Sequence, residues 1–155
     1  MKRVIYHLFL AICLFSMTSC LTGGLEDLPV YEDANITSVS AVQYRYISDE
    51  KSPASGEYLV KNVNMTYTSE IDVDAGLVQI SVSTPDNFPA EELGNLSTEN
   101  LLIAVSISTA ARITPETNSP KLGVPGDWSK PNQYVVEAAN GTKKNWTIEI
   151  VSLKK

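Results

Sequence analysis

Hydrophobic and polar residues alternate along most of the chain after residue 35, with the period of two that is typical of half-buried β-strands. The clearest cases are residues 78–83, where valine and isoleucine alternate with glutamine and serine, and residues 103–108, where they alternate with alanine and serine. Further strands are expected at 36–47, 58–67, 71–73, 133–138 and 145–151, separated by loops or turns at 48–56, 74–76, 84–100 and 115–131. A short helical turn is expected at 90–93, and no segment has a sustained helical period. About seven short strands at this spacing predict an all-β sandwich.

The hairpin near the C-terminal end has two alternative registers. A two-residue turn at Asn140-Gly141, which this dipeptide favours, would set Tyr134 opposite Thr147. A three-residue loop at 139–141, with Gly141 left-handed, would set Tyr134 opposite Trp146 instead. Only the second register places all the large apolar side chains on one face, and a slip of one residue inverts a strand's faces. We therefore predict the three-residue loop, with Trp146 buried.

The first twenty residues have the order of a secretory signal. Lys2 and Arg3 are followed by an apolar run at 4–15 and by Met17-Thr18-Ser19 before Cys20. This order resembles a bacterial lipoprotein signal in which Cys20 receives the lipid, although Met17 stands where leucine is usual. The apolar run is shorter than the roughly 20 residues that span a bilayer. The alternative is an ordinary cleaved signal followed by an incidental cysteine.

Three segments are expected: a signal peptide at 1–19, a lipidated N-terminus with an acidic flexible tether at 20–35, and one β-sandwich domain at 36–155. The chain has 12 basic and 18 acidic residues, a net charge of -6, and two of the basic residues lie in the signal. An acidic domain lacks the basic surface that nucleic acids require. Its acidity also opposes adsorption to anionic lipid, so the expected link to the membrane is the N-terminal lipid.

Histidine and free thiols are absent from the expected mature domain. The only histidine, His7, and Cys13 lie in the signal, and Cys20 would be blocked as a thioether. This excludes Ser-His-Asp and Cys-His nucleophiles, zinc sites with histidine or cysteine ligands, and structural disulfides. We therefore expect a protein that is not an enzyme and that needs no cofactor.

The second half of the chain carries a succession of motifs that resembles a known family. They are Asp127-Trp128-Ser129-Lys130-Pro131, Tyr134-Val135-Val136-Glu137-Ala138, Asn140-Gly141-Thr142-Lys143-Lys144 and Trp146-Thr147-Ile148-Glu149-Ile150. This succession is similar to the immunoglobulin-like domains of unknown function in Bacteroidetes-type surface lipoproteins. The resemblance implies a single Ig-like antiparallel β-sandwich on the cell surface, anchored to the outer membrane.

Such domains often accompany polysaccharide-uptake systems. The resemblance therefore implies a non-catalytic glycan-binding or accessory lipoprotein. The alternative is a structural spacer or protein-interaction domain of an outer-membrane complex, with an outer-membrane transporter or other surface lipoproteins as partners. The family carries no catalytic motif, so the fold alone implies no mechanism.

Three aromatic residues are candidates for contact with a sugar. Tyr44 and Tyr46 share one face of the expected strand at 36–47, where exposed rings would form a stacking platform. Trp128 lies in a loop rich in glycine and proline. The alternative for all three is burial in the core, where strand aromatics usually pack.

Three carboxylates are candidates for a calcium site. Glu70, Asp72 and Asp74 alternate along one strand face and end close to Gly76. Carboxylate oxygens are the ligands that Ca²⁺ prefers, but the twelve-residue calcium-loop pattern is absent. The alternative is a solvated strand face that leads into a tight turn.

Overall fold

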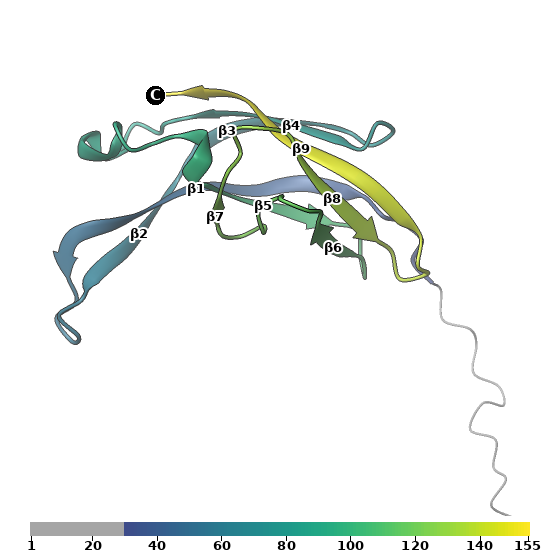
Figure 1. The fold of residues 1–155 in the computed structure, drawn as a ribbon, viewed down its shortest axis with the longest axis horizontal. Coiled ribbons are helices and arrows are strands. Elements are labelled where there is room, and N and C mark those ends of the chain that lie inside the picture. The colour runs from purple at the N-terminus through teal and green to yellow at the C-terminus, as the bar shows by residue number, and fades with distance from the viewer. Residues whose placement is uncertain (1–29) are drawn as a thin grey trace, which may run out of the picture.

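The computed structural model describes residues 30–155, which form nine strands and two short 3₁₀ helices (Figure 1). The expected signal peptide and Cys20 lie outside the described residues. In chain order the elements are β1 (Ile36–Lys51), β2 (Tyr58–Asn64), β3 (Thr66–Asp72), β4 (Leu77–Ser83), η1 (Ala90–Glu92), η2 (Thr98–Asn100), β5 (Leu101–Ile107), β6 (Arg112–Pro115), β7 (Pro125–Gly126), β8 (Asn132–Glu137) and β9 (Lys143–Lys154).

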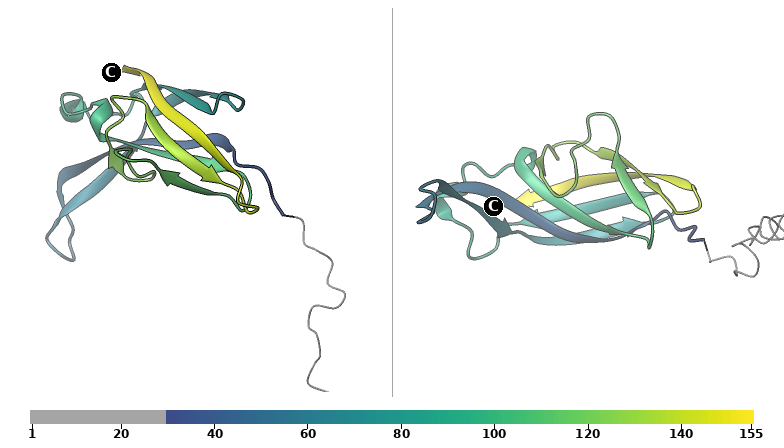
Figure 2. Two further views of the ribbon diagram at one scale, coloured as in Figure 1. Left: turned by 45° about the vertical axis from the view of Figure 1, so that its right-hand side comes forward. Right: turned by 90° about the horizontal axis from the view of Figure 1, so that it is seen from below.

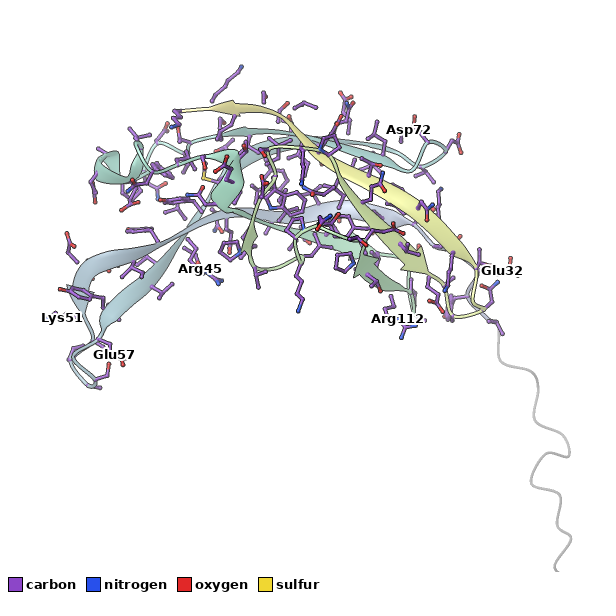
Figure 3. All side chains as sticks on the ribbon, viewed as in Figure 1. Glu32, Arg45, Lys51, Glu57, Asp72 and Arg112 are labelled. Atoms are coloured by element: carbon purple, nitrogen blue, oxygen red, sulfur yellow. The ribbon has the colours of Figure 1, made fainter. Side chains whose placement is uncertain are left out.

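The strands form two sheets that pack as a sandwich (Figure 2). One sheet has four strands in the order β2-β1-β5-β7, and the other has five in the order β3-β4-β9-β8-β6. Apolar side chains from the two inner faces fill the space between them, with Trp128, Trp146 and Tyr134 as the largest fully buried residues. Charged side chains such as Arg112 and Asp72 lie on the outside (Figure 3). The all-β sandwich expected from the alternating pattern is confirmed.

Not all neighbouring strands are antiparallel, because β4 and β9 pair in parallel, with Val78 beside Ile148. After β4 the chain crosses to β5 in the four-stranded sheet, back to β6, across again to β7, and then through β8 to β9, which lies beside β4 (Figure 1). A parallel pair requires a long connection of this kind. Sequence alternation reports which face of a strand is buried and not the direction of its neighbour, so the pattern could not reveal this pair.

Residues 58–72 form two strands in different sheets, and the break between them falls inside the strand that the sequence predicts at 58–67. The change of sheet occurs at Met65, whose side chain is buried and whose N–H donates to the carbonyl of Val42 at 2.9 Å. After Met65 the chain continues as β3 and pairs with β4. The turn expected at 74–76 joins these two strands, and Gly76 has a positive φ of 65°.

The β8–β9 hairpin has the predicted three-residue loop. Tyr134 lies opposite Trp146, and Gly141 is left-handed with φ of 87°. The Ala138 N–H donates to the carbonyl of Thr142 at 2.8 Å and closes the loop. Trp146 is 1% exposed, so burial of the large apolar face decided between the two registers.

Residues 31–35, which were expected to belong to the flexible tether, are bound to the sandwich. The carbonyl of Tyr31 accepts from the Asn140 N–H at 3.3 Å, and Asn35 exchanges hydrogen bonds with Ser108. Lys144 donates to the Asn35 side chain at 3.3 Å and to the carbonyl of Val73. The folded unit therefore begins about five residues before the first strand.

At the opposite end of the molecule, β1 and β2 extend beyond the sandwich as a two-stranded hairpin (Figure 1). The last residue of β1 that pairs with β5 is Tyr44, opposite Leu101. Beyond it, β1 pairs only with β2, through a register shift between Ile47 and Lys51. We call residues 45–62 the arm.

Candidate functional site

Tyr44 is a core residue. Its side chain is 2% exposed, and its ring packs on Phe88 with the ring centroids 5.5 Å apart. The hydroxyl donates to the Glu92 carboxylate at 2.7 Å. Burial, together with the Glu92 carboxylate, raises the pKa of the Tyr44 phenol. The hypothesis of an exposed sugar platform is therefore corrected at this position, because the ring is needed to fill the sandwich.

Tyr46 stacks on Tyr44, with the ring centroids 6.0 Å apart, and is half-buried. It lines a small groove of about 170 Å³ on the side of the arm that faces Glu91 and Glu92. In this groove Lys61 Nζ lies 2.5 Å from the Glu50 carboxylate, and this hydrogen bond raises the pKa of the Lys61 ammonium. With its neighbour buried, Tyr46 does not form the flat pair of exposed rings that stacking on a sugar chain requires.

Trp128 is also a core residue. It is 1% exposed, its indole N–H donates to the carbonyl of Leu101 at 2.9 Å, and its ring stacks on Tyr134. The Tyr134 hydroxyl in turn donates to the carbonyl of Pro120 at 2.7 Å. These bonds satisfy the polar atoms of both aromatic side chains inside the protein. The hypothesis that Trp128 contacts a ligand is corrected as well.

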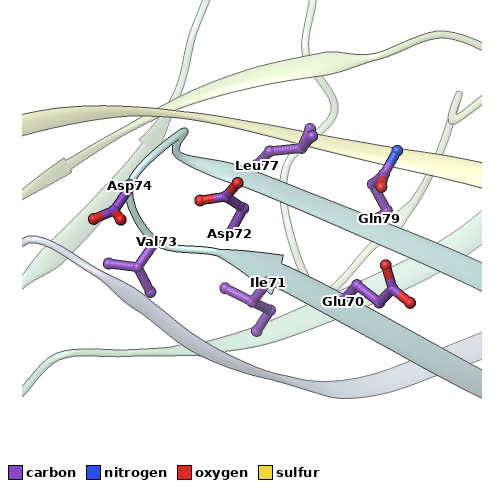
Figure 4. Close-up of a pocket in the computed structure, with 7 residues that line it drawn as sticks. All are labelled: Glu70, Ile71, Asp72, Val73, Asp74, Leu77 and Gln79. Atoms are coloured by element: carbon purple, nitrogen blue, oxygen red, sulfur yellow. The ribbon is translucent and has the colours of Figure 1, made fainter.

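Glu70, Asp72 and Asp74 line a shallow hollow at the β3–β4 turn, with Glu70 and Asp74 at its two ends (Figure 4). Glu70 and Asp72 lie on β3, whereas Asp74 lies in the turn that follows, so the three residues do not share one strand face. Asp72 also accepts from the Ala75 N–H at 2.9 Å and so supports the turn. Within residues 30–155, no three histidine, cysteine, aspartate or glutamate side chains are placed to hold a metal ion. The calcium site stays a prediction, and these contacts favour its alternative, a solvated strand face that leads into a turn.

The outer face of the arm presents a different set of residues, arranged in cross-strand pairs. Ile47 lies directly opposite Val60, and the two side chains are 69% and 61% exposed. Next to them Arg45 donates to the Asn62 side chain at 2.8 Å. On the other side Tyr58, 55% exposed, lies opposite Lys51, whose ammonium is 4.9 Å from the ring centroid. The result is an apolar pair with a polar pair on one side and an aromatic–cation pair on the other.

One sequence pattern indicates this surface, although it played no part in predicting the strands. In 58–63 apolar residues fall on both faces of the strand, with Tyr58 and Val60 on one side and Leu59 and Val63 on the other. A strand that lies over a core on one face normally has polar residues on the other. Apolar residues on both faces therefore indicate that the second face has its own role.

Comparison with known proteins places the chain in a family. Among the described residues no helix is long and apolar enough to cross a membrane. No curated protein matches the sequence. A crystal structure described as that of a "putative secreted protein" from Bacteroides fragilis is similar, with 39% sequence identity and a TM-score of 0.72, and the match covers 82% of this chain and all of that one. The family model DUF5018-related matches residues 36–149. The chain belongs to the DUF5018-related family.

Proposed function

We propose that this protein is a non-catalytic module of the bacterial cell envelope that binds another protein through the arm. The observation that carries the proposal is the exposed pair of Ile47 and Val60 on a hairpin that extends beyond the sandwich. Exposed apolar side chains grouped together and bordered by polar residues mark interaction sites. Arginine and tyrosine, which Arg45 and Tyr58 supply here, are enriched at protein interfaces.

The position of the arm supports this role. Residues 31–35 are bound beside the β8–β9 loop, and β1 runs from there into the arm (Figure 1). Its 16 residues, of which the last seven belong to the arm, span roughly 50 Å at the usual rise of a strand. If Cys20 carries the lipid, the arm is held at the end of the domain far from the membrane. The similarity to a protein described as secreted, and the signal-like N-terminus, support a location outside the cytoplasm.

Binding of an extracellular glycan is the second candidate, and one observation favours it. Tyr58 is an exposed ring on the arm, and the side chains of Asn62 and Asn64 follow it on the same strand face. Lys51 lies over this ring, however, and the Asn62 and Asn64 side chains already accept hydrogen bonds from Arg45 and Gln43. Branched apolar side chains at the centre of the face fit a protein surface better than a sugar ring.

The proposal is tested by photo-crosslinking in living cells of the source bacterium. A benzophenone amino acid is introduced at Val60 and, as the matched control, at Val151, another exposed valine on β9. We expect a discrete crosslinked protein from position 60 and none from position 151. Equal crosslinking from both positions, or none from either, would contradict the proposal. Affinity electrophoresis against cell-wall and dietary polysaccharides tests the alternative, which predicts retardation that Tyr58→Ala abolishes.

A further inference from the structure

The arm has a free strand edge. In the four-stranded sheet β2 is an outer strand with β1 as its only neighbour. The Met65 N–H donates to the carbonyl of Val42, so these two residues form a hydrogen-bonded pair between β1 and β2. Hydrogen-bonded pairs recur at every second position of an antiparallel ladder, so Tyr44 with Val63 and Tyr46 with Lys61 are also hydrogen-bonded pairs. By alternation, the even-numbered residues of β2 direct their backbone N–H and C=O groups to the free side. Four residues, 58, 60, 62 and 64, therefore offer a template for another strand.

This edge lacks the usual protection against pairing. Outer strands are commonly protected by proline, by lysine, or by a bulge in the outer strand itself. β2 contains no proline, and its one charged residue, Lys61, lies on the groove face, where it pairs with Glu50. The arm is also electrically neutral, with three basic and three acidic residues in a chain of net charge -6. Two arms can therefore approach each other without the repulsion that opposes contact between the acidic bodies.

From these features we propose that β2 pairs antiparallel with β2 of a second copy of this chain, centred on Val60. This inference rests on the proposal that the arm binds protein, and it names the partner. In this register Val60 faces its symmetry mate and Tyr58 faces Asn62 of the other copy. Ile47 and Val60 of both copies then form one continuous apolar row across four strands.

The symmetric registers shifted towards Asn62 are less favourable. A register centred on Lys61 would place two lysines directly opposite each other, which is destabilising. A register centred on Asn62 would set Val60 against Asn64 and interrupt the apolar row. In the register centred on Val60, Lys61 faces Leu59 of the other copy, and its aliphatic stem can cover that side chain.

The test is sedimentation equilibrium of residues 21–155 over a wide range of concentration. These residues include the whole of the described sandwich and leave out the expected signal peptide and Cys20. We expect a reversible dimer for the wild type and for Val151→Lys, and a dissociation constant raised at least about tenfold by Val60→Lys. A wild type that is monomeric at every concentration, or a Val60→Lys variant that dimerises equally well, would overturn the inference.

Cysteine crosslinking tests the register itself. Residues 21–155 contain no cysteine, so a single introduced thiol reports on one contact. Hydrogen-bonded antiparallel partners have Cα atoms about 5.5 Å apart, within disulfide range. Val60→Cys should therefore form a disulfide dimer, and Tyr58→Cys should crosslink to Asn62→Cys, while Val151→Cys should not crosslink. The protein could instead be monomeric while position 60 photo-crosslinks to a different protein in cells. That result would overturn the inference that the partner is a second copy of this chain, but it would still support the proposed function.

Discussion

The indole N–H of Trp146 donates a hydrogen bond to the backbone carbonyl of Ala34, 3.0 Å away and 112 positions earlier in the chain. This bond ties the segment before β1 to the centre of the five-stranded sheet. Lys144 reinforces the same contact, since its ammonium lies 5.0 Å from the Trp146 ring and donates to Asn35. Tension on an N-terminal anchor would therefore act on the sandwich through Trp146 and its neighbours.

Trp146→Phe should keep most of the packing and lose this hydrogen bond. The carbonyl of Ala34, a 5% exposed residue, would be left without its partner, at a cost of about 1 to 3 kcal/mol of unfolding free energy. Urea denaturation measures the change. Tyr67→Phe is the control, because it removes a hydrogen bond from a half-buried hydroxyl to the carbonyl of Val39 and should cost less. Equal stability of Trp146→Phe and the wild type would show that the bond does not hold the segment.

Gly76→Ala should be strongly destabilising. A Cβ at this position would lie 2.4 Å from the carbonyl oxygen of Asn145, and the backbone φ of 65° disfavours any other residue. Because the obstacle is backbone, relief requires β9 to move away from the turn. We expect a loss of several kcal/mol, on the scale of severe single substitutions. Thermal melts measure the loss, and Gly94→Ala, where a Cβ meets open space, should be nearly neutral.

Stability should fall at alkaline pH. Burial raises the pKa of Tyr134, and burial with Glu92 raises that of Tyr44. A raised pKa in the folded state means that both phenols stabilise the fold below their unfolded pKa of about 10, and that this stability is lost as the pH rises above it. Tyrosinate absorbance followed with circular dichroism should show these two residues ionising only as the protein unfolds. Ionisation of all tyrosines with the fold intact would contradict this expectation.

Cys20→Ser should release the protein from the membrane fraction. Cys20 is the expected site of lipid addition, and an acidic domain has no other expected attachment to anionic lipid. Metabolic labelling with a fatty-acid probe, followed by fractionation, measures both consequences. Thr22→Ser, which lies after the cysteine and outside the signal, is a suitable control. A Cys20→Ser protein that still carries label would exclude this residue as the lipid site.

Structural features that depend only on which face of a strand is buried could be predicted from the sequence. The register of the β8–β9 hairpin followed from the requirement that Tyr134 and Trp146 share a buried face, and the structure confirms it. The parallel pairing of β4 with β9 depends on how distant segments meet, and local alternation carries no information about that.

The candidate site was less predictable for a related reason. Tyr44 could be a core residue or an exposed one, and the loop that carries Glu92 and Phe88, some 45 residues away, decides which. In the same way Ile47 and Val60 resemble core residues in sequence. They are exposed because they lie on the outer face of the arm, opposite to the face that carries Tyr46 and Lys61.

The central claim is that the free edge and apolar pair of the arm bind a protein, and amide hydrogen exchange at Val60 and Asn62 tests it most directly. These N–H groups point away from β1, so in dilute ¹⁵N-labelled protein they should exchange fast, whereas the Tyr134 and Trp146 amides within the five-stranded sheet should exchange slowly. Addition of unlabelled protein, or of unlabelled envelope extract from the source bacterium, should slow exchange at Val60 and Asn62 selectively. Unchanged exchange at both positions after both additions would contradict the claim.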